Sequence, residues 1–199
     1  MIHSRQLIRA LCLGCLTLCS ACAINPADPV TNSYPAAYRD ALSDFPGAAD
    51  VAPETIAEFT NFLSELGSPD SGERAAQLYA AHLHFSDALL LTNNREVVVE
   101  HFAGLSDSGA SVDVTMHDII TQQADIYLIW SMQARFRPVR REVSSDTLGI
   151  THIRFNDENQ VVLHQDFWDT GLGFYSHVPV LGSIVNAIAR RFDPAPDGQ

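Results

Sequence analysis

The chain contains no lysine, and it has no cysteine after residue 22. Its 199 residues carry 12 arginines against 24 acids, which gives a formal net charge of −12. An acidic surface repels phosphate backbones, so we expect no nucleic-acid partner. A folded region without cysteine cannot form an internal disulfide. A hydrophobic content of 46% is ample for the core of one domain.

The four cysteines, at positions 12, 15, 19 and 22, lie within the apolar run Leu11–Cys22. Arg5 and Arg9 precede this run, and the order of charged and apolar segments is typical of a signal peptide. The run is shorter than the roughly 20 apolar residues that a transmembrane helix needs. The cysteine spacing could suggest zinc, but the segment offers no polar shell to hold metal ligands. We therefore expect no metal site.

The end of the run, Leu18-Cys-Ser-Ala-Cys22, resembles a bacterial lipobox, although Cys19 stands where leucine is usual. The resemblance implies that Cys22 is lipidated and becomes the first residue of the mature chain. Ala23, in place of an aspartate, favours the outer membrane, with the protein facing the periplasm. Several acyl chains on one cysteine would give stable anchoring. Removal of residues 1–21 leaves 10 arginines against 24 acids, a formal charge of −14.

Residues 23–52 are rich in proline, alanine, aspartate and asparagine and show no sustained period. We expect 22–52 to form a lipid-anchored flexible tether, with at most a short turn of helix near 38–42. The folded domain is expected over 53–192, and the tail 193–199 is expected to be disordered.

Apolar stripes and capping pairs predict three helices, over 53–66, 70–81 and about 93–105. His82 and His84 follow the second helix at strand spacing. Such a pair could bind a metal, but polar positions on a half-exposed strand are the more common role.

From residue 110 onward the hydrophobic period changes from 3.6 to 2, which indicates strands. We expect strands near 112–117, 126–136, 143–155 and 161–168, with a possible bulge at Gly149. The last element is an amphipathic helix over Val180–Phe192. It could pack on its own sheet or on a second subunit in a homodimer, or lie on a membrane. Helices followed by a meander of long strands predict an α+β fold, in which a curved antiparallel sheet wraps around the first helices and encloses a cone-shaped pocket.

Groups able to move a proton are concentrated in the last hairpin. His164, Asp166 and Trp168 share one face of the final strand, and an odd-numbered loop would add His152 to that face. Beside Trp168, the Asp166 carboxylate would be shielded from water, which raises its pKa and makes it a stronger base. The alternative is that Asp166 only pairs with Arg154 or His152 on a wet sheet face.

Three short motifs resemble those of the SnoaL-like branch of the nuclear-transport-factor-2-like superfamily. They are Phe85-Ser-Asp87, Arg154-Phe155 and His164-Gln-Asp166. Residues 175–182 add to the likeness, which covers about 54–192. The resemblance implies the same α+β cone. The superfamily contains ketosteroid isomerases, polyketide cyclases, epoxide hydrolases and proteins that only bind ligands or partners.

In the polyketide cyclases of this family an aspartate on a late strand abstracts a proton next to a carbonyl, assisted by a histidine. The resemblance implies Asp166 in that role, with His152 or His164 as the histidine. The strand 125–137 lacks the Arg-x-Asp arrangement of an epoxide hydrolase.

Two functions follow from these observations. The chain either binds a small apolar ligand in its cone without chemistry, or it is an isomerase- or cyclase-type enzyme with Asp166 as general base. We favour binding, because the sequence identifies no oxyanion donor, and we expect no cofactor. Trp130 and Met132, with Trp168, could wall the pocket or simply fill the core. Asp87 could reach the pocket mouth or cap a turn.

Overall fold

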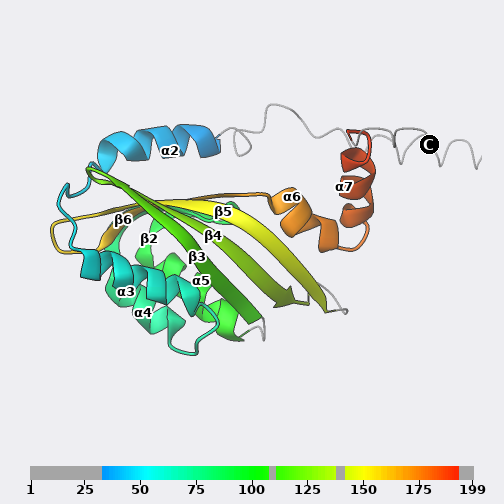
Figure 1. Cartoon of the computed structure of the whole chain (residues 1–199), viewed down its shortest axis with the longest axis horizontal. Helices are drawn as coiled ribbons and strands as arrows, with labels where there is room; N and C mark the ends of the chain where they lie inside the picture. Colours follow the sequence, from blue (N-terminus) through cyan, green and yellow to red (C-terminus); the bar gives the residue numbers. More distant parts are fainter. Residues whose placement is uncertain (1–32, 108–110, 138–141, 193–199) are drawn as a thin grey trace, which may run out of the picture. The chain divides into compact units, whose positions relative to one another are not determined.

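The computed structural model describes residues 33–107, 111–137 and 142–192 (Figure 1). The contacts divide the chain after Ala36, and the fold lies in the unit that follows. The segment 1–21 that we expect to be a signal peptide, Cys22 and the tail 193–199 lie outside the described residues. The described helices are α2 (Ser33–Asp44), α3 (Pro53–Ser64), α4 (Ser71–Leu78), α5 (Arg95–Asp107), α6 (Thr170–Gly173), the 3-10 helix η3 (Tyr175–His177) and α7 (Leu181–Ala189). None of these helices is long and apolar enough to cross a membrane.

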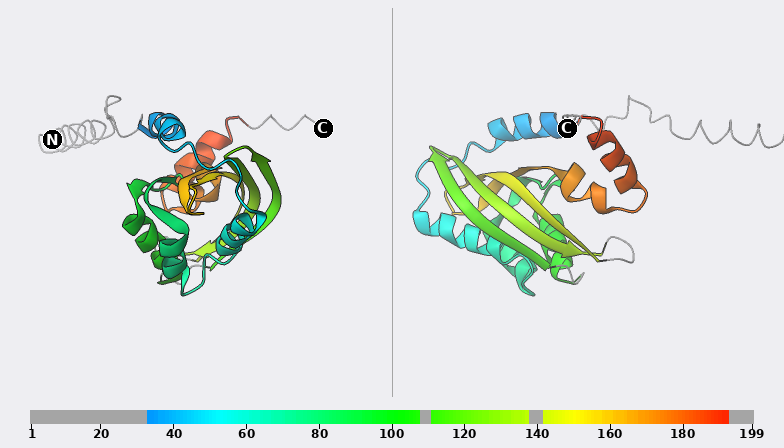
Figure 2. Two further views of the ribbon diagram at one scale, coloured as in Figure 1. Left: turned by 90° about the vertical axis from the view of Figure 1, so that its left-hand side faces the viewer. Right: turned by 45° about the vertical axis from the view of Figure 1, so that its right-hand side comes forward.

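Among the described residues, six strands form one curved, unclosed sheet in the order β2-β1-β6-β5-β4-β3. Strands β3 to β6 make an antiparallel meander, whereas β1 pairs with β6 in parallel. The sheet curves around α3, α4 and α5, as the end-on view of Figure 2 shows. The predicted α+β class, with a curved sheet and N-terminal helices, is confirmed. The strands are β1 (Tyr79–Ser86), β2 (Leu91–Asn94), β3 (Ser111–Gln122), β4 (Asp125–Phe136), β5 (Val143–Phe155) and β6 (Val161–Trp168).

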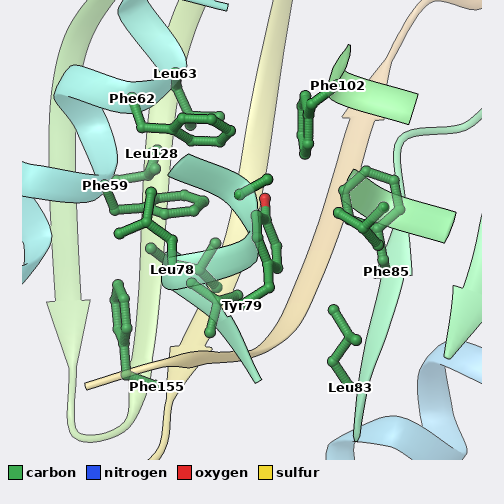
Figure 3. Packing of buried hydrophobic residues seen from close by; sticks show 14 of the residues in the cluster. Phe59, Phe62, Leu63, Leu78, Tyr79, Leu83, Phe85, Phe102, Leu128 and Phe155 are labelled. Atoms are coloured by element: carbon green, nitrogen blue, oxygen red, sulfur yellow. The ribbon is translucent and has the colours of Figure 1, made fainter. Parts of the chain in front are cut away.

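An aromatic core fills the space between the helices and the concave face of the sheet (Figure 3). Phe59 and Phe62 come from α3, Tyr79 and Phe85 from β1, and Phe102 from α5, and all five are buried. Phe62 and Phe102 meet edge to face, with ring centroids 5.0 Å apart. The buried positions predicted for the first and third helices, among them Phe59 and Phe102, therefore do face the core.

Several elements differ from the sequence prediction: β2 was not expected, β3 runs on to Gln122, and α7 ends at Ala189. The second helix ends at Leu78 rather than near Ala81, because Tyr79 begins a buried strand that pairs with β6. The alanine-rich sequence favours helix, but burial of Tyr79 outweighs that local preference. Within the range expected to be a tether, α2 is a helix of 12 residues, longer than the turn expected near 38–42.

A buried polar network joins α2 to the outer face of the sheet. The Tyr38 hydroxyl lies 2.8 Å from His152 Nδ1, and His152 Nε2 lies 2.8 Å from Asp125 Oδ1. The Arg154 guanidinium donates through Nε to Asp125 Oδ1 at 2.6 Å. Its Nη1 atom also donates to two backbone carbonyls at the end of α2, those of Leu42 and Phe45. The guanidinium thus caps the C-terminus of α2, where a helix has free carbonyl groups.

Gly149 does not mark a bulge, because the pairing of β4 with β5 runs without interruption past it. It lies directly opposite Trp130, and a Cβ atom at this position would collide with the indole ring. The glycine is therefore needed to make room for Trp130. The irregularities of the meander lie elsewhere, between Met116 and Asp118 and between Arg154 and Phe155.

Replacing Gly149 should test this requirement. We expect Gly149→Ala to lower the free energy of unfolding by about 1–3 kcal/mol, because Trp130 has to shift within a packed core. Gly104 lies exposed in α5, and a Cβ there would meet nothing within 4 Å. We therefore expect Gly104→Ala to raise stability by about 0.5–1 kcal/mol. Urea unfolding of both variants measures the difference, and equal stabilities would contradict the proposed role of Gly149.

Two buried histidines on the outer face of the sheet are expected to make the stability depend on pH. Burial lowers the pKa of His152, and the hydrogen bond and charge of Asp125 oppose the shift only in part. Burial likewise lowers the pKa of His84, which hydrogen-bonds the side-chain oxygen of Gln165. In the unfolded chain these histidines take up protons near pH 6.5, whereas in the folded chain they do so only at lower pH. The free energy of unfolding is therefore highest above about pH 6.5 and decreases as the pH falls below it.

Urea unfolding between about pH 7.5 and about pH 5.5 should show a decline of up to about 1.4 kcal/mol per pH unit for each of these histidines. We expect the decline to be shallower in His84→Gln and in His152→Gln. His117, exposed on β3, provides the matched control variant His117→Gln. If all three variants retained the slope of the wild type, the buried imidazoles would not be its source.

Candidate functional site

A cavity of about 260 Å³ lies between the concave face of the sheet and helices α3 and α5. Its walls are largely apolar, and Gly173 and Phe174 contribute to its lining. A concave apolar site with few polar groups is the usual form of a small-molecule site. Side chains that line it include Leu63, Leu66, Phe102, Val114, Met132 and Trp168.

Asp166 is one of the few charged groups in this cavity. It lies on β6 directly opposite Thr151 of β5, so both side chains face the concave side. The Thr151 hydroxyl donates to Asp166 Oδ1 at 2.6 Å, and His164 Nε2 lies 3.0 Å from the same oxygen. Among the described residues, none hydrogen-bonds Asp166 Oδ2. One carboxylate oxygen is therefore held in place while the other remains available to a ligand.

Two hydrogen-bond chains converge on Asp166 Oδ1. In one, the Trp130 indole N–H donates to the Thr151 oxygen at 2.8 Å. In the other, the Tyr79 hydroxyl lies 2.8 Å from His164 Nδ1. Burial, with the charges of Asp166 and Asp87, raises the pKa of Tyr79 well above its ordinary value, so Tyr79 keeps its proton.

The direction of the second chain follows from the chemistry of its members. An ionised carboxylate only accepts hydrogen bonds, so His164 must donate through Nε2 when Asp166 is charged. A neutral imidazole then accepts at Nδ1, and Tyr79 supplies that proton. His164 is held in one tautomer and aimed at the carboxylate.

A second carboxylate and imidazole pair lines the same cavity. Asp87 Oδ1 accepts the backbone N–H groups of Leu89 and Leu90, at 2.9 and 2.7 Å. Its Oδ2 lies 2.7 Å from His101 Nε2 on α5. Burial alone would raise the pKa of Asp87, but the bond and charge of His101, together with the backbone donors, hold it below its ordinary value. Asp87 thus both caps its turn and reaches the cavity.

Most of the residues singled out from the sequence meet in this cavity. They are Asp87, Trp130, Met132, His164, Asp166 and Trp168. The Trp168 indole N–H donates to the Asp87 backbone carbonyl at 2.8 Å, which ties β6 to the end of β1. His101 was not singled out, although its position three residues after Val98 places it beside the buried stripe of its helix.

The expected position of His152 is wrong. The loop 156–160 has an odd number of residues, as that expectation required, but an irregularity between Arg154 and Phe155 shifts the register by one residue. His152 therefore pairs with Gln165 and faces the outer side, where it contacts Tyr38 and Asp125. A shift of one residue exchanges the two faces of a strand.

The alternative role considered for Asp166, pairing with Arg154 or His152, is also wrong. Both of those side chains bind Asp125 on the outer face. No group of three or more potential metal ligands occurs among the described residues. His82 and His84 do not act together, since His84 bonds Gln165 whereas the His82 ring packs 5.8 Å from that of Phe45.

No family model matches the chain, and no curated protein matches it in sequence. Solved structures do resemble it. A putative SnoaL-like polyketide cyclase from Shewanella denitrificans OS-217 has a TM-score of 0.53 and 10% identity, over 61% of this chain and 94% of that one. A second putative SnoaL-like polyketide cyclase, from Shewanella putrefaciens CN-32, gives 0.52 and 10%, over 69% and 88%. An epoxide hydrolase of M. tuberculosis described as LEH-like gives 0.50 and 12%, over 69% and 94%.

At such low identity the likeness concerns the fold alone. The chain has the cone-shaped α+β fold of the SnoaL-like and nuclear-transport-factor-2-like proteins.

Proposed function

We propose that this protein binds a small apolar ligand inside the cone, and that Asp166 provides one polar contact to it. The observation that carries the proposal is an apolar cavity whose carboxylate has one oxygen held by Thr151 and His164 and the other without a described partner. A volume of about 260 Å³ is near the lower end of the range for ligand pockets, which favours a small molecule.

The lining also defines the chemistry of the ligand. Apolar walls favour a hydrocarbon body, and Asp166 Oδ2 can accept a hydrogen bond from one hydroxyl or amine of the ligand. Asp87 already has His101 and two backbone N–H groups as partners, so it has less capacity to bind a ligand. A molecule with a single donor group at one end fits this arrangement best.

The proposal includes a lipid anchor on Cys22 that holds the domain at the bacterial outer membrane, on the periplasmic side. Its support is the lipobox-like end of the apolar run, behind Arg5 and Arg9. Several acyl chains on one cysteine would make the attachment stable. The acidic surface of the chain disfavours nucleic-acid partners at any location.

Ligand binding can be tested by blocking the cavity. We expect the neutral dye N-phenyl-1-naphthylamine to bind the protein and gain fluorescence, because its fused rings match apolar walls. Val114 lines the cavity, whereas Thr115 is its exposed neighbour on the other face of β3. Val114→Trp should weaken dye binding at least about tenfold, since the indole occupies the cavity. Thr115→Trp is the matched control with the same bulk.

Equal binding by the two variants would show that the dye binds elsewhere. Native mass spectrometry of the purified protein should in addition reveal a co-purifying small molecule. The mass of that molecule would narrow the identity of the natural ligand. The Val114→Trp variant should purify without the molecule.

A second function, proton abstraction next to a carbonyl, is favoured by one observation. Asp166 Oδ2 is available in an apolar cavity, and Thr151 and His164 fix the opposite oxygen of the same carboxylate. A carboxylate that is positioned but not fully bonded can accept a proton from carbon. The imidazole could stabilise the protonated acid that results or return its proton.

This chemistry can be measured as deuterium incorporation into small enolisable ketones in heavy water, followed by NMR. If the activity exists, we expect Asp166→Asn to lower the rate by about 10²–10⁴, the usual contribution of a general base. Dye binding should survive, because asparagine keeps the shape of the side chain. Asp146→Asn, on the exposed side of β5, is the control. Exchange that persists in Asp166→Asn would exclude this base.

A further inference from the structure

The last described helix, α7, exposes an apolar face. Leu181, Ile184 and Ile188 recur at spacings of three and four, so they share one side of the helix. Ile184 and Ile188 are each 53% exposed, and Phe192, just beyond the helix, is 84% exposed. On the opposite side lie polar residues, among them Asn186. An apolar face of this size is unusual on a surface that contacts only water.

The structure explains why this face is not turned inward. α7 packs against η3 and α6, as Figures 1 and 2 show. Its contact is made through Gly182, where a Cβ would collide with the backbone of Ser176. Val180 holds the preceding turn at a φ of 68°, a conformation that β-branched residues rarely adopt. The helix is thus fixed by its glycine side, and its isoleucines point outward.

The charge of this region differs from that of the rest of the chain. Residues 170–192 contain no acid, although the whole chain has 24, and they include Arg190 and Arg191. Both arginines are exposed directly after α7. An anionic surface would repel most of this acidic protein but would attract this segment.

We propose that α7 binds the surface of an anionic lipid bilayer, with Leu181, Ile184 and Ile188 entering the boundary between headgroups and acyl chains. Apolar residues on one side and cations beside them are the pattern of helices that lie in a membrane interface. A second copy of the chain that pairs through the same face fits less well, because it would bring two further arginines beside Arg190 and Arg191. The bilayer contact is separate from the cavity and from any acyl chain on Cys22.

Amide hydrogen exchange of the full chain tests the proposal, because it reports on α7 separately from the rest of the chain. Binding of the N-terminal segment to the vesicles can thus be told apart from binding of α7. All measurements use protein that carries Cys22→Ser, which removes the proposed acylation site. Vesicles with about one third phosphatidylglycerol in phosphatidylcholine should slow exchange of the amides of α7, and pure phosphatidylcholine should slow it much less. The exchange rates of amides in β3 and β4 should be the same with and without vesicles, which would show that the fold is intact.

Variants distinguish the contribution of the apolar face of α7 from that of the two arginines. We expect Ile184→Ser with Ile188→Ser to abolish the protection of α7. Arg190→Gln and Arg191→Gln should each weaken vesicle binding about fivefold at low salt. Ile120→Ser with Leu148→Ser is the matched control, because these side chains are 49% and 71% exposed on the sheet. It should leave the protection in place.

Two results would overturn the proposal. One is the absence of any lipid-dependent protection of α7. The other is protection that appears without vesicles and increases with protein concentration, which would assign the face to a second copy. Loss of dye binding in the cavity would bear only on the proposed ligand and not on α7.

Discussion

The position of the Asp166 carboxylate depends on one extra residue in β6. Phe155 pairs with Val161, but Arg154 pairs with Leu163, so Val162 has no partner of its own across the hairpin. From that point on, Thr151 lies opposite Asp166 and His152 opposite Gln165. A regular hairpin would have placed His152 opposite His164. The irregularity therefore sends one set of polar side chains into the cone and another set outward.

The two faces use their polar groups for different purposes. On the outer face, Asp125 neutralises Arg154 and accepts a bond from His152, and the network holds α2. Inside the cone, Thr151 and His164 both bond one oxygen of Asp166. A side chain held from two directions loses little further freedom when a ligand arrives, which favours either binding or proton transfer. The architecture alone does not select between them.

Much of this arrangement could be read from the sequence. Alternation of apolar and polar residues located β3 to β6, and stripes such as Phe59 with Leu63 located the helices. The convergence of Asp87 with Asp166 could not be predicted from the sequence, because no local pattern indicates that β1 pairs with β6. The shift at Val162 has no sequence signal either, since a valine suits a regular strand as well. His101 could not be identified from the sequence, because only the packing of α5 on β1 brings it to Asp87.

The parallel pairing of β1 with β6 has a consequence for the order in which the molecule forms. Tyr79 and His164 bond across 85 positions of chain, whereas the hairpins of the meander join neighbouring segments. Closing a long loop costs entropy before any contact compensates for it, so we expect the meander to assemble early and β1 to join late. Asp87 and His101 would then complete the cone in the final step, and a ligand could be enclosed only by the finished fold.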